Sequence, residues 1–445
     1  MRIHFIAIGG AIMHSLAIEL KNNGHIISGS DDVIYDPAKS NLEKHNLLPK
    51  SVGWNASRIH KEIDVVILGM HAKLDNPELL KAQDLQLKIV SFPEFIYDYS
   101  KSKKRIVIAG SHGKTTITSM ILHVLNDNNI KVDYLLGAKI ESVENLVNLK
   151  DNEVIIIEGD EYLSSAIDKR PKFLHYQPTI LVVSGVAWDH VNVFPTLASY
   201  QKAFKDVLNN VIDSSGQVFF NGDDLFLSSF LENTTTTAYS VPHYQIENGV
   251  LFIEYNSKKI PLKIFGKHNL YNLEAAKSVC LQLGLSEQSF YSSIQKFIGA
   301  NKRLNLVKEY ESNSSIYLDF AHSPSKVLAT IDAVKELYPN RYLIACLELY
   351  TYSSLNPDFI PQYHNVFDKA DEVWIYIDQV RIQSKNKDVL EEEVIYHNIQ
   401  HKKLRFINKK ELLFSNLSKL KFHDMNLLLM SSGTFSGLII NNVFN

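Results

Sequence analysis

A glycine-rich segment that could bind phosphate lies at Gly110–Thr116, where the sequence reads GSHGKTT. The common phosphate-binding loop follows the pattern GxxxxGK[ST], but Ile108 stands where the first glycine of that pattern belongs. An apolar run precedes the segment and a helical pattern follows it, so backbone N–H groups and a positive helix end would point at a phosphate. We predict that Lys114 contacts a terminal phosphate and that the Thr115 hydroxyl binds Mg²⁺. A chance match in an ordinary strand-to-helix turn is the alternative.

Acidic side chains end a second apolar run, in EVIIIEGDE. Glu158, Asp160 and Glu161 would emerge at the carboxyl end of this strand, which is the edge where open α/β sheets bind ligands. Mg²⁺ prefers carboxylate and phosphate oxygens, so one of these three side chains is predicted to bind the metal. His190 ends the next run, TILVVSGVAWDH, and is a second candidate ligand, although taken alone it would fit a structural histidine.

Two glycines and an acidic pair follow the first strands of the chain. The run IHFIAI is followed by Gly9 and Gly10, and the next run leads into GSDD at Gly29–Asp32. Glycines after the first strand and an acidic residue after the second are typical of a nucleotide-binding βαβ unit. Ser30 and Asp31 are therefore candidates for the same site. Taken alone, the glycines fit a purely structural turn equally well.

Parallel strands are needed to bring these residues together, and the order of apolar and amphipathic segments in the sequence predicts such strands. Apolar runs alternate with amphipathic stretches, which predicts the α/β class with doubly wound parallel sheets. A polar, basic segment at 99–105 indicates a linker. Residues 218–264 contain short apolar runs separated by turn residues, which indicates a small β insertion. Because one hydrophobic core stops growing near ~250–300 residues, this chain should hold several domains. We predict a Rossmann-like domain at 1–102, a central P-loop ATPase-type domain with the β insertion at 103–299, and a C-terminal Rossmann-like α/β domain at 300–445.

The composition argues against several functional classes. The chain carries 46 basic and 49 acidic side chains and a formal net charge of −3, so it has no electrostatic footprint for nucleic acid or an anionic membrane. Its two cysteines, Cys280 and Cys346, form no ligand-spaced cluster, which argues against a disulfide framework or a structural zinc site. No apolar run reaches the ~18 residues of a membrane-spanning helix. We expect a cytoplasmic protein, a monomer or weak homodimer, without nucleic-acid or membrane partners.

Together these segments resemble the Mur ligase family, the ATP-dependent amide-forming enzymes of peptidoglycan precursor assembly. GSHGKTT is similar to the shortened phosphate loop of that family, which lacks the distal glycine, and this likeness accounts for Ile108. EGDEY and WDH also match, followed by GKHNLYNLEAA, NKRLNLV and DFAHSP in the family's order. The resemblance covers essentially the whole chain and implies an enzyme that uses ATP and Mg²⁺.

The resemblance also implies which residues form the site. Lys114, Glu158 and His190 would be catalytic, and Mg²⁺ would bind Thr115, Glu158 and His190. The residues expected to bind ATP are Gly110, Ser111, His112, Gly113, Lys114, Thr115, Thr116, Asn269, Arg303 and Asp319. The residues expected to bind a UDP-sugar are Gly9, Gly10, Ser30, Asp31 and His71. The residue expected to contact the acceptor is His322.

In the implied reaction, the carboxylate of UDP-N-acetylmuramate attacks the γ-phosphate of ATP, and an amine then attacks the acyl phosphate. The segment EGDEYLSSAIDKRPKFLHYQP is similar to the branch of the family that attaches the tripeptide L-alanyl-γ-D-glutamyl-meso-diaminopimelate during peptidoglycan recycling. The segment YTYSSLNPDF lacks the arginines usual in the branch that adds L-alanine. We predict the tripeptide as the acceptor, with L-alanine as the alternative.

Two other functions would also use a phosphate loop. A nucleotide-dependent binding switch would hydrolyse ATP without an acid or an amine substrate, and it has no need of Glu158 and His190 beside the loop. A folate-polyglutamating relative would share the central and C-terminal architecture, but it has no use for the N-terminal IAIGG and GSDD unit. Both are less consistent with the sequence than a Mur-type ligase.

Overall fold

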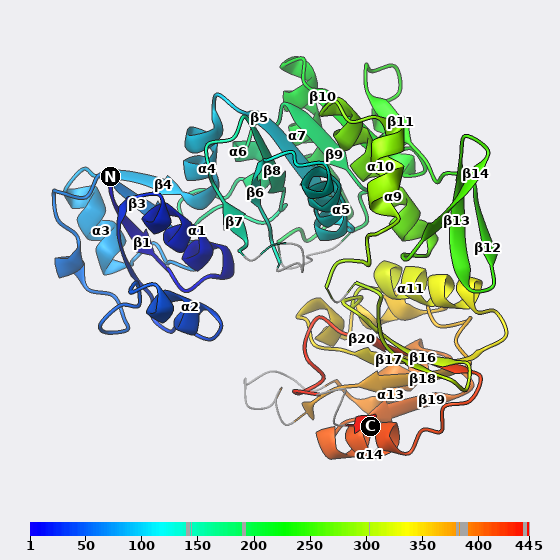
Figure 1. Cartoon of the computed structure of the whole chain (residues 1–445). Helices are drawn as coiled ribbons and strands as arrows, with labels where there is room; N and C mark the ends of the chain where they lie inside the picture. Colours follow the sequence, from blue (N-terminus) through cyan, green and yellow to red (C-terminus); the bar gives the residue numbers. More distant parts are fainter. Residues whose placement is uncertain are drawn as a thin grey trace. The chain divides into compact units, whose positions relative to one another are not determined.

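The computed structural model describes residues 1–138, 143, 145–188, 193–301, 303–379, 382, 390–438 and 443–444. They form two compact units. Unit 1 holds Met1–Trp188, Thr196–Ser240 and Ala275–Ser286, and unit 2 holds the described residues of 189–195, 241–274 and 287–445. Helices alternate with the strands of several sheets (Figure 1). The α/β class predicted from the sequence is confirmed, whereas the division into three domains stays a prediction.

The first sheet of unit 1 is parallel, with the strand order β2-β1-β3-β4. Its strands are β1 (Arg2–Ile6), β2 (Ile26–Ser30), β3 (Val65–Leu68) and β4 (Lys88–Ser91). The helices along this part of the chain are α1 (Ala11–Asn22), α2 (Ala38–Lys44), the short η1 (Ala56–Arg58), α3 (Pro77–Asp84) and α4 (Phe92–Ser100). Every residue of β3 is buried, as expected for a parallel strand covered on both faces. A capping box between Ser91 and Glu94 fixes the start of α4.

The second sheet of unit 1 has the order β11-β10-β9-β5-β8-β6-β7. Its strands are β5 (Lys104–Ala109), β6 (Asp133–Leu135), β7 (Val147–Asn148), β8 (Val154–Glu158), β9 (Ile180–Val183), β10 (Gln217–Asn221) and β11 (Thr237–Tyr239). The helices of this part are α5 (Lys114–Asp127), α6 (Lys172–His175), α7 (Leu197–Asp213) and α8 (Leu225–Phe230). Because β5 lies between β8 and β9, the turn that follows β5 lies at the middle of the sheet's carboxyl edge. The β insertion predicted at 218–264 is shorter than expected, because β10 and β11 extend this sheet in parallel.

The linker predicted at 99–105 is also wrong in extent. Helix α4 ends at Ser100 and β5 begins at Lys104, so the connection is short. Arg105 belongs to β5 and is only 9% exposed. Its guanidinium donates to the backbone oxygens of Ser100, Lys101, Lys103, Tyr176 and Gln177. These carbonyls replace the water that a basic linker would have bound.

Unit 2 contains a small antiparallel sheet and a larger one of the order β15-β16-β20-β17-β18-β19. The small sheet consists of β12 (Tyr244–Glu247), β13 (Val250–Tyr255) and β14 (Lys258–Leu262). The larger sheet consists of β15 (Asn305–Tyr310), β16 (Ser314–Asp319), β17 (Tyr342–Glu348), β18 (Glu372–Tyr376), β19 (Leu404–Ile407) and β20 (Met425–Met430), with β15 alone antiparallel to its neighbour. Among the described residues outside unit 1, the helices are α10 (Glu287–Ile294), α11 (Pro324–Leu337), η2 (Ser353–Leu355), η3 (Ile360–Tyr363), α13 (Glu392–Asn398) and α14 (Lys410–Ser418). Helix α9 (Lys267–Gln282) contributes to both units. In the described part of the chain, no helix combines the length and the apolar character needed to cross a membrane.

Candidate active site

The turn after β5 contains glycine at the two positions where its backbone requires it. Gly110 has φ +124° and Gly113, the residue before α5, has φ +81°. A Cβ atom at Gly110 would lie 2.1 Å from Ser184 Oγ and 2.9 Å from Ser184 N, so a larger residue would collide with the end of β9. Ile108 lies before the turn, fully buried within β5. The loop therefore needs no glycine at 108, because Gly110 makes the close approach.

Lys114 folds back onto the loop that carries it. Its Nζ donates to Gly110 O at 2.7 Å and to Glu161 Oε2 at 2.9 Å. Burial lowers the pKa of Lys114, but the carboxylates of Glu161, Asp160 and Glu158 outweigh burial, so the net shift is upward. The side chain is therefore an ammonium ion, and a phosphate bound at this turn would compete with Glu161 for it.

Glu161 links the loop to the neighbouring helix, a role that sequence reasoning did not assign. Its side chain is fully buried, and its Oε1 accepts a hydrogen bond from Tyr200 OH at 3.2 Å. Tyr200 OH also lies 2.9 Å from Ser111 Oγ, which accepts from Ala187 N at 2.9 Å. The network joins the phosphate loop, the end of β8 and helix α7. The acidic pair after Glu158 was the one signal in the sequence that could have pointed to it.

Two oxygen donors that suit Mg²⁺ lie together beside the loop. Thr115 Oγ1 donates to Glu158 Oε2 at 3.0 Å, and both side chains are buried. A hydroxyl and a carboxylate next to a phosphate-binding turn form the set of hard ligands that Mg²⁺ takes together with phosphate oxygens. These residues therefore fit the metal predicted from the sequence. His190, the further predicted ligand, lies outside the described residues.

The glycine turn after β1 holds a carboxylate. Gly9 N donates to Asp31 Oδ2 at 2.7 Å, and a Cβ atom at Gly9 would lie 2.9 Å from the same oxygen. Burial raises the pKa of Asp31 to about 6, although the hydrogen bond from Gly9 opposes the shift. Gly10 is the residue before α1. Three of the residues predicted for the UDP-sugar thus lie together at the start of this helix.

Ser30, a fourth residue predicted for the UDP-sugar, supports the turn from inside. Its hydroxyl donates to the buried carboxylate of Glu78. Its backbone oxygen accepts from Ala7 N at 2.9 Å and from Ile8 N at 3.0 Å. These bonds hold the turn that leads to Gly9, and a direct contact of Ser30 with a ligand stays a prediction.

A cavity of about 200 Å³ in unit 1 connects the N-terminal turn with the acidic end of β8. Its lining includes Gly10, Ile12, His71, Glu158, Asp160 and Lys172. His71, the last residue predicted for the UDP-sugar, therefore shares one cavity with Gly10 and Glu158. A ligand bound at Gly10 could extend through this cavity as far as Glu158.

The segment between β8 and α6 closes on itself like a hairpin. Lys172 N donates to Tyr162 O at 2.8 Å, Ser164 N donates to Arg170 O at 3.0 Å, and Leu163 forms an antiparallel bridge with Pro171. We call the residues 160–172 the β8–α6 hairpin. Its closure returns the chain to the sheet edge, so that Lys172 Nζ lies 3.5 Å from Asp160 Oδ2.

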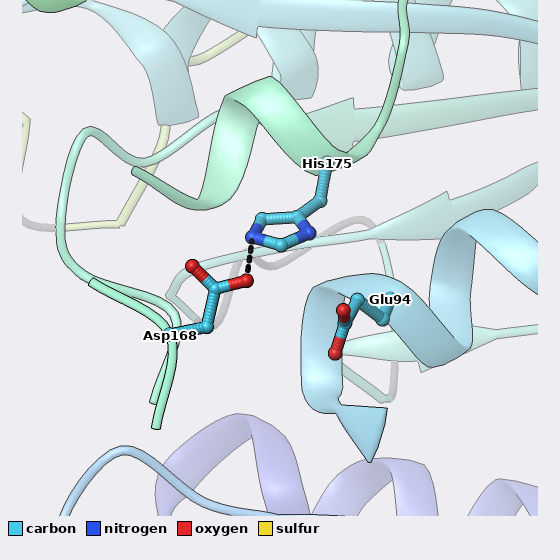
Figure 2. A group of neighbouring side chains, drawn as sticks. All are labelled: Glu94, Asp168 and His175. Atoms are coloured by element: carbon cyan, nitrogen blue, oxygen red, sulfur yellow. Dashed lines mark ion pairs between the residues drawn. The ribbon is translucent and has the colours of Figure 1, made fainter. Parts of the chain in front are cut away.

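An ion-pair cluster fixes this hairpin. Figure 2 shows His175 on α6 facing Asp168, with Glu94 on α4 beside them. His175 Nε2 lies 3.4 Å from Asp168 Oδ2, and the same carboxylate accepts from Arg170 Nη2 at 2.6 Å. The bond from Arg170 lowers the pKa of Asp168, whereas burial, followed by the charge of Arg170, lowers the pKa of His175. Glu94, Asp168 and His175 lie close enough to hold a cation, but Arg170 already supplies the positive charge there.

In unit 2, three predicted residues lie together near the end of β16. Asp319 ends this strand, and its Oδ2 accepts from Leu304 N at 2.5 Å. The guanidinium of Arg303 lies 4.3 Å from the centre of the Phe320 ring, and His322 Nδ1 lies 2.9 Å from Phe320 O. The structure therefore groups Arg303, Asp319 and His322.

Asn269, also predicted to bind ATP, lies in the first turn of α9. Its Nδ2 donates to Phe265 O at 2.9 Å, and the side chain is largely buried. Burial lowers the pKa of the adjacent His268, which favours a neutral imidazole. A contact of Asn269 with ATP stays a prediction.

Comparison with known proteins places this arrangement in a family. The Mur ligase middle domain matches residues 108–280, and the Mur ligase family catalytic domain matches residues 2–104. The UDP-N-acetylmuramate–L-alanine ligase of Sulfurihydrogenibium sp. is 31% identical over 384 residues, which cover 83% of this chain and 81% of the relative. The UDP-N-acetylmuramate–L-alanyl-γ-D-glutamyl-meso-2,6-diaminoheptandioate ligase of Haemophilus influenzae is 28% identical over 352 residues, 75% of this chain and 76% of the relative.

The fold is similar to that of solved members. The UDP-N-acetylmuramate–alanine ligase from Thermotoga maritima aligns with a TM-score of 0.69 at 21% identity, over 98% of this chain and 96% of that structure. The two domain matches cover more than half of the sequence, and they include both the glycine turn at Gly9–Gly10 and the phosphate loop at Gly110–Thr116. The chain belongs to the Mur ligase family, the ATP-dependent amide ligases of peptidoglycan synthesis.

Proposed function

We propose that this chain joins the carboxylate of UDP-N-acetylmuramate to the amine of the tripeptide L-alanyl-γ-D-glutamyl-meso-diaminopimelate, with activation by ATP. The observation that supports the acid substrate is the cavity that runs from Gly10 and His71 to Glu158. An acid whose nucleotide part binds at Gly10 would present its carboxylate beside Glu158, next to the phosphate loop. The substrates named for the relatives from Sulfurihydrogenibium sp. and Haemophilus influenzae both include UDP-N-acetylmuramate.

The residues around the loop support the first chemical step. A carboxylate oxygen of the acid attacks the γ-phosphorus of ATP, the bond to ADP breaks, and an acyl phosphate forms. Lys114 exchanges Glu161 for the γ-phosphate and keeps its charge throughout, as its raised pKa requires. Thr115 and Glu158 would hold Mg²⁺, which when bound neutralises charge on the phosphates. The amine of the acceptor then attacks the acyl carbon and loses a proton. The bond from this carbon to the phosphate oxygen breaks, and phosphate leaves.

Two features favour the tripeptide as the acceptor. The β8–α6 hairpin carries Asp168, Lys169 and Arg170, in the segment that resembles the tripeptide-adding branch. The segment after β17, residues 350–359, contains no arginine, although arginines are usual there in the L-alanine-adding branch. The relative from Haemophilus influenzae is named for the same tripeptide.

L-alanine is the second candidate acceptor, because the relative at 31% identity is an L-alanine ligase. One assay decides between the two. The protein is given ATP, Mg²⁺ and UDP-N-acetylmuramate with either the tripeptide or L-alanine, and the products are identified by mass. We expect kcat/KM for the tripeptide to exceed that for L-alanine by roughly tenfold or more. A preference for L-alanine would contradict the proposed acceptor while leaving the ligase chemistry intact.

A further inference from the structure

The cavity of unit 1 would bring the carboxylate of the acid substrate close to acidic side chains of the protein. Glu158 and Asp160 both line it, and the acid substrate would enter it as a carboxylate. Like charges a few ångströms apart in a site of low dielectric repel strongly. Mg²⁺ held by Thr115 and Glu158 would offset part of this charge, and a positive side chain beside Asp160 would offset the rest. Among the described residues that line the cavity, Lys172 is the one lysine or arginine.

Lys172 is placed to make that contact. Its side chain is 16% exposed, and its Nζ lies 3.5 Å from Asp160 Oδ2. Charge-assisted hydrogen bonds are usually about 2.7–2.9 Å long, so this pair is a loose one. An ammonium group has three donors, and those that Asp160 does not engage are available to a ligand. The ring of Tyr162 lies 5.9 Å from Nζ and covers one side of the ammonium group.

The position of Lys172 is also defined by its surroundings. Its backbone N–H closes the β8–α6 hairpin on Tyr162, and Phe173 N donates to Asp160 O at 3.2 Å. The ion pairs of Asp168 with Arg170 and with His175 fix the rest of the hairpin, and Figure 2 shows the pair of Asp168 and His175. Because the backbone at Lys172 is already fixed, only the side chain has to be ordered when a ligand binds.

We propose that Lys172 binds the carboxylate of the acid substrate and thereby selects a sugar nucleotide that carries an acid. This inference rests on the proposed function and assigns the acid end of that substrate to one side chain. Lys172 pairs with the carboxylate before and during its attack on phosphorus, and Asp160 keeps the ammonium group directed into the cavity before the substrate binds.

Two ligands that differ in one group test the proposal directly. UDP-N-acetylmuramate carries a lactyl carboxylate that UDP-N-acetylglucosamine lacks, while the uridine diphosphate and the sugar ring are shared. We measure the Kd of each by calorimetry for the full chain and for Lys172→Met. We expect the substitution to raise the Kd of UDP-N-acetylmuramate about 10- to 100-fold, the usual loss for a charge-assisted hydrogen bond. The Kd of UDP-N-acetylglucosamine should change by no more than about twofold.

Lys169→Met is the matched control, because Lys169 lies on the same hairpin but is exposed and does not line the cavity. It removes the same charge, and neither Kd should change. Lys172→Arg should recover part of the loss, and it also covers the case in which Lys172→Met fails to fold. Equal weakening of both ligands, or no change in either, would overturn the role of Lys172. Wild-type protein that binds neither nucleotide would instead overturn the proposed function.

Discussion

Lys114 Nζ lies 2.9 Å from Glu161 Oε2, so the lysine of the phosphate loop is paired with a fully buried carboxylate. This pairing keeps the ammonium group charged and directed across the loop. In the proposed reaction, the γ-phosphate takes the place of Glu161 at Lys114, while Tyr200 continues to donate to the carboxylate. In that reaction, the ion pair would couple nucleotide binding to the network between the loop and α7.

Replacing Lys114 with Met should abolish ligation, with a fall in kcat of about 1000-fold or more, because the γ-phosphate loses its positive contact. It should also lower the free energy of unfolding by roughly 3 kcal/mol, because the buried carboxylate of Glu161 loses its counter-charge. Adding Glu161→Gln should restore most of the stability but none of the activity. Urea unfolding and ATP-dependent phosphate release measure the two effects. Full activity in Lys114→Met would contradict the phosphate contact.

The hydroxyl of Thr115 should set the requirement for Mg²⁺. Thr115→Val keeps the shape of the side chain but removes the oxygen that lies 3.0 Å from Glu158, so the Mg²⁺ concentration for half-maximal activity should rise on the order of tenfold or more. Thr115→Ser keeps the oxygen and should behave like the wild type. Activity is measured during a Mg²⁺ titration at fixed ATP. Identical Mg²⁺ curves for Val and Ser would count against this metal site.

Gly110→Ala should weaken ATP binding more than the strain of a positive φ angle alone would. The new Cβ would lie 2.9 Å from Ser184 N, a backbone atom that cannot turn away. Gly24→Ala is the matched control, since Gly24 also has positive φ, +84°, but a Cβ atom there would meet nothing within 4 Å. We expect Gly24→Ala to cost about 1 kcal/mol in stability with normal ATP affinity. Gly110→Ala should weaken ATP binding at least about tenfold, and equal ATP affinity in the two variants would refute the close approach.

Asp31 should make stability depend on pH between about 4 and 6. Its pKa in the folded protein, about 6, lies above its ordinary value of 3.8, so ionisation of this carboxyl costs the folded state free energy. Its contribution to stability is fully present below pH 4 and is lost as the pH rises through about 6. The difference of roughly two pKa units corresponds to about 3 kcal/mol. The free energy of unfolding is measured for the wild type and for Asp31→Asn at pH 4 and at pH 7. Between these pH values the wild type should lose about this much stability relative to the variant. The same pH dependence in both proteins would show that Asp31 does not titrate here.

The sequence predicted the sheets well because buried parallel strands are continuous apolar runs. The runs that contain β1, β5, β8 and β9 all form strands where they were expected. The glycine turn before α5 could also be predicted, since Gly110, Gly113 and Lys114 lie within five residues of chain. Ile108 looked like an exception only because the pattern counts positions, whereas the backbone requires glycine at the points of positive φ.

The remaining features depend on contacts between distant segments. Arg105 looked like part of a basic linker because its carbonyl partners at Tyr176 and Gln177 come from far along the chain. Lys172 gives no signal of its own in the sequence, because nothing local shows that the hairpin returns it to Asp160. Roles that arise from chain closure require the fold itself.

The most direct test of the ligase chemistry follows the oxygen of the acid substrate. UDP-N-acetylmuramate labelled with ¹⁸O in its carboxylate is incubated with the protein, ATP, Mg²⁺ and the tripeptide, and the released phosphate and the product are weighed by mass spectrometry. Activation of the acid at the Lys114 loop predicts phosphate that carries one ¹⁸O and an amide product that has lost one. Phosphate without ¹⁸O would contradict transfer of the γ-phosphate to the acid and, with it, the central role of that loop.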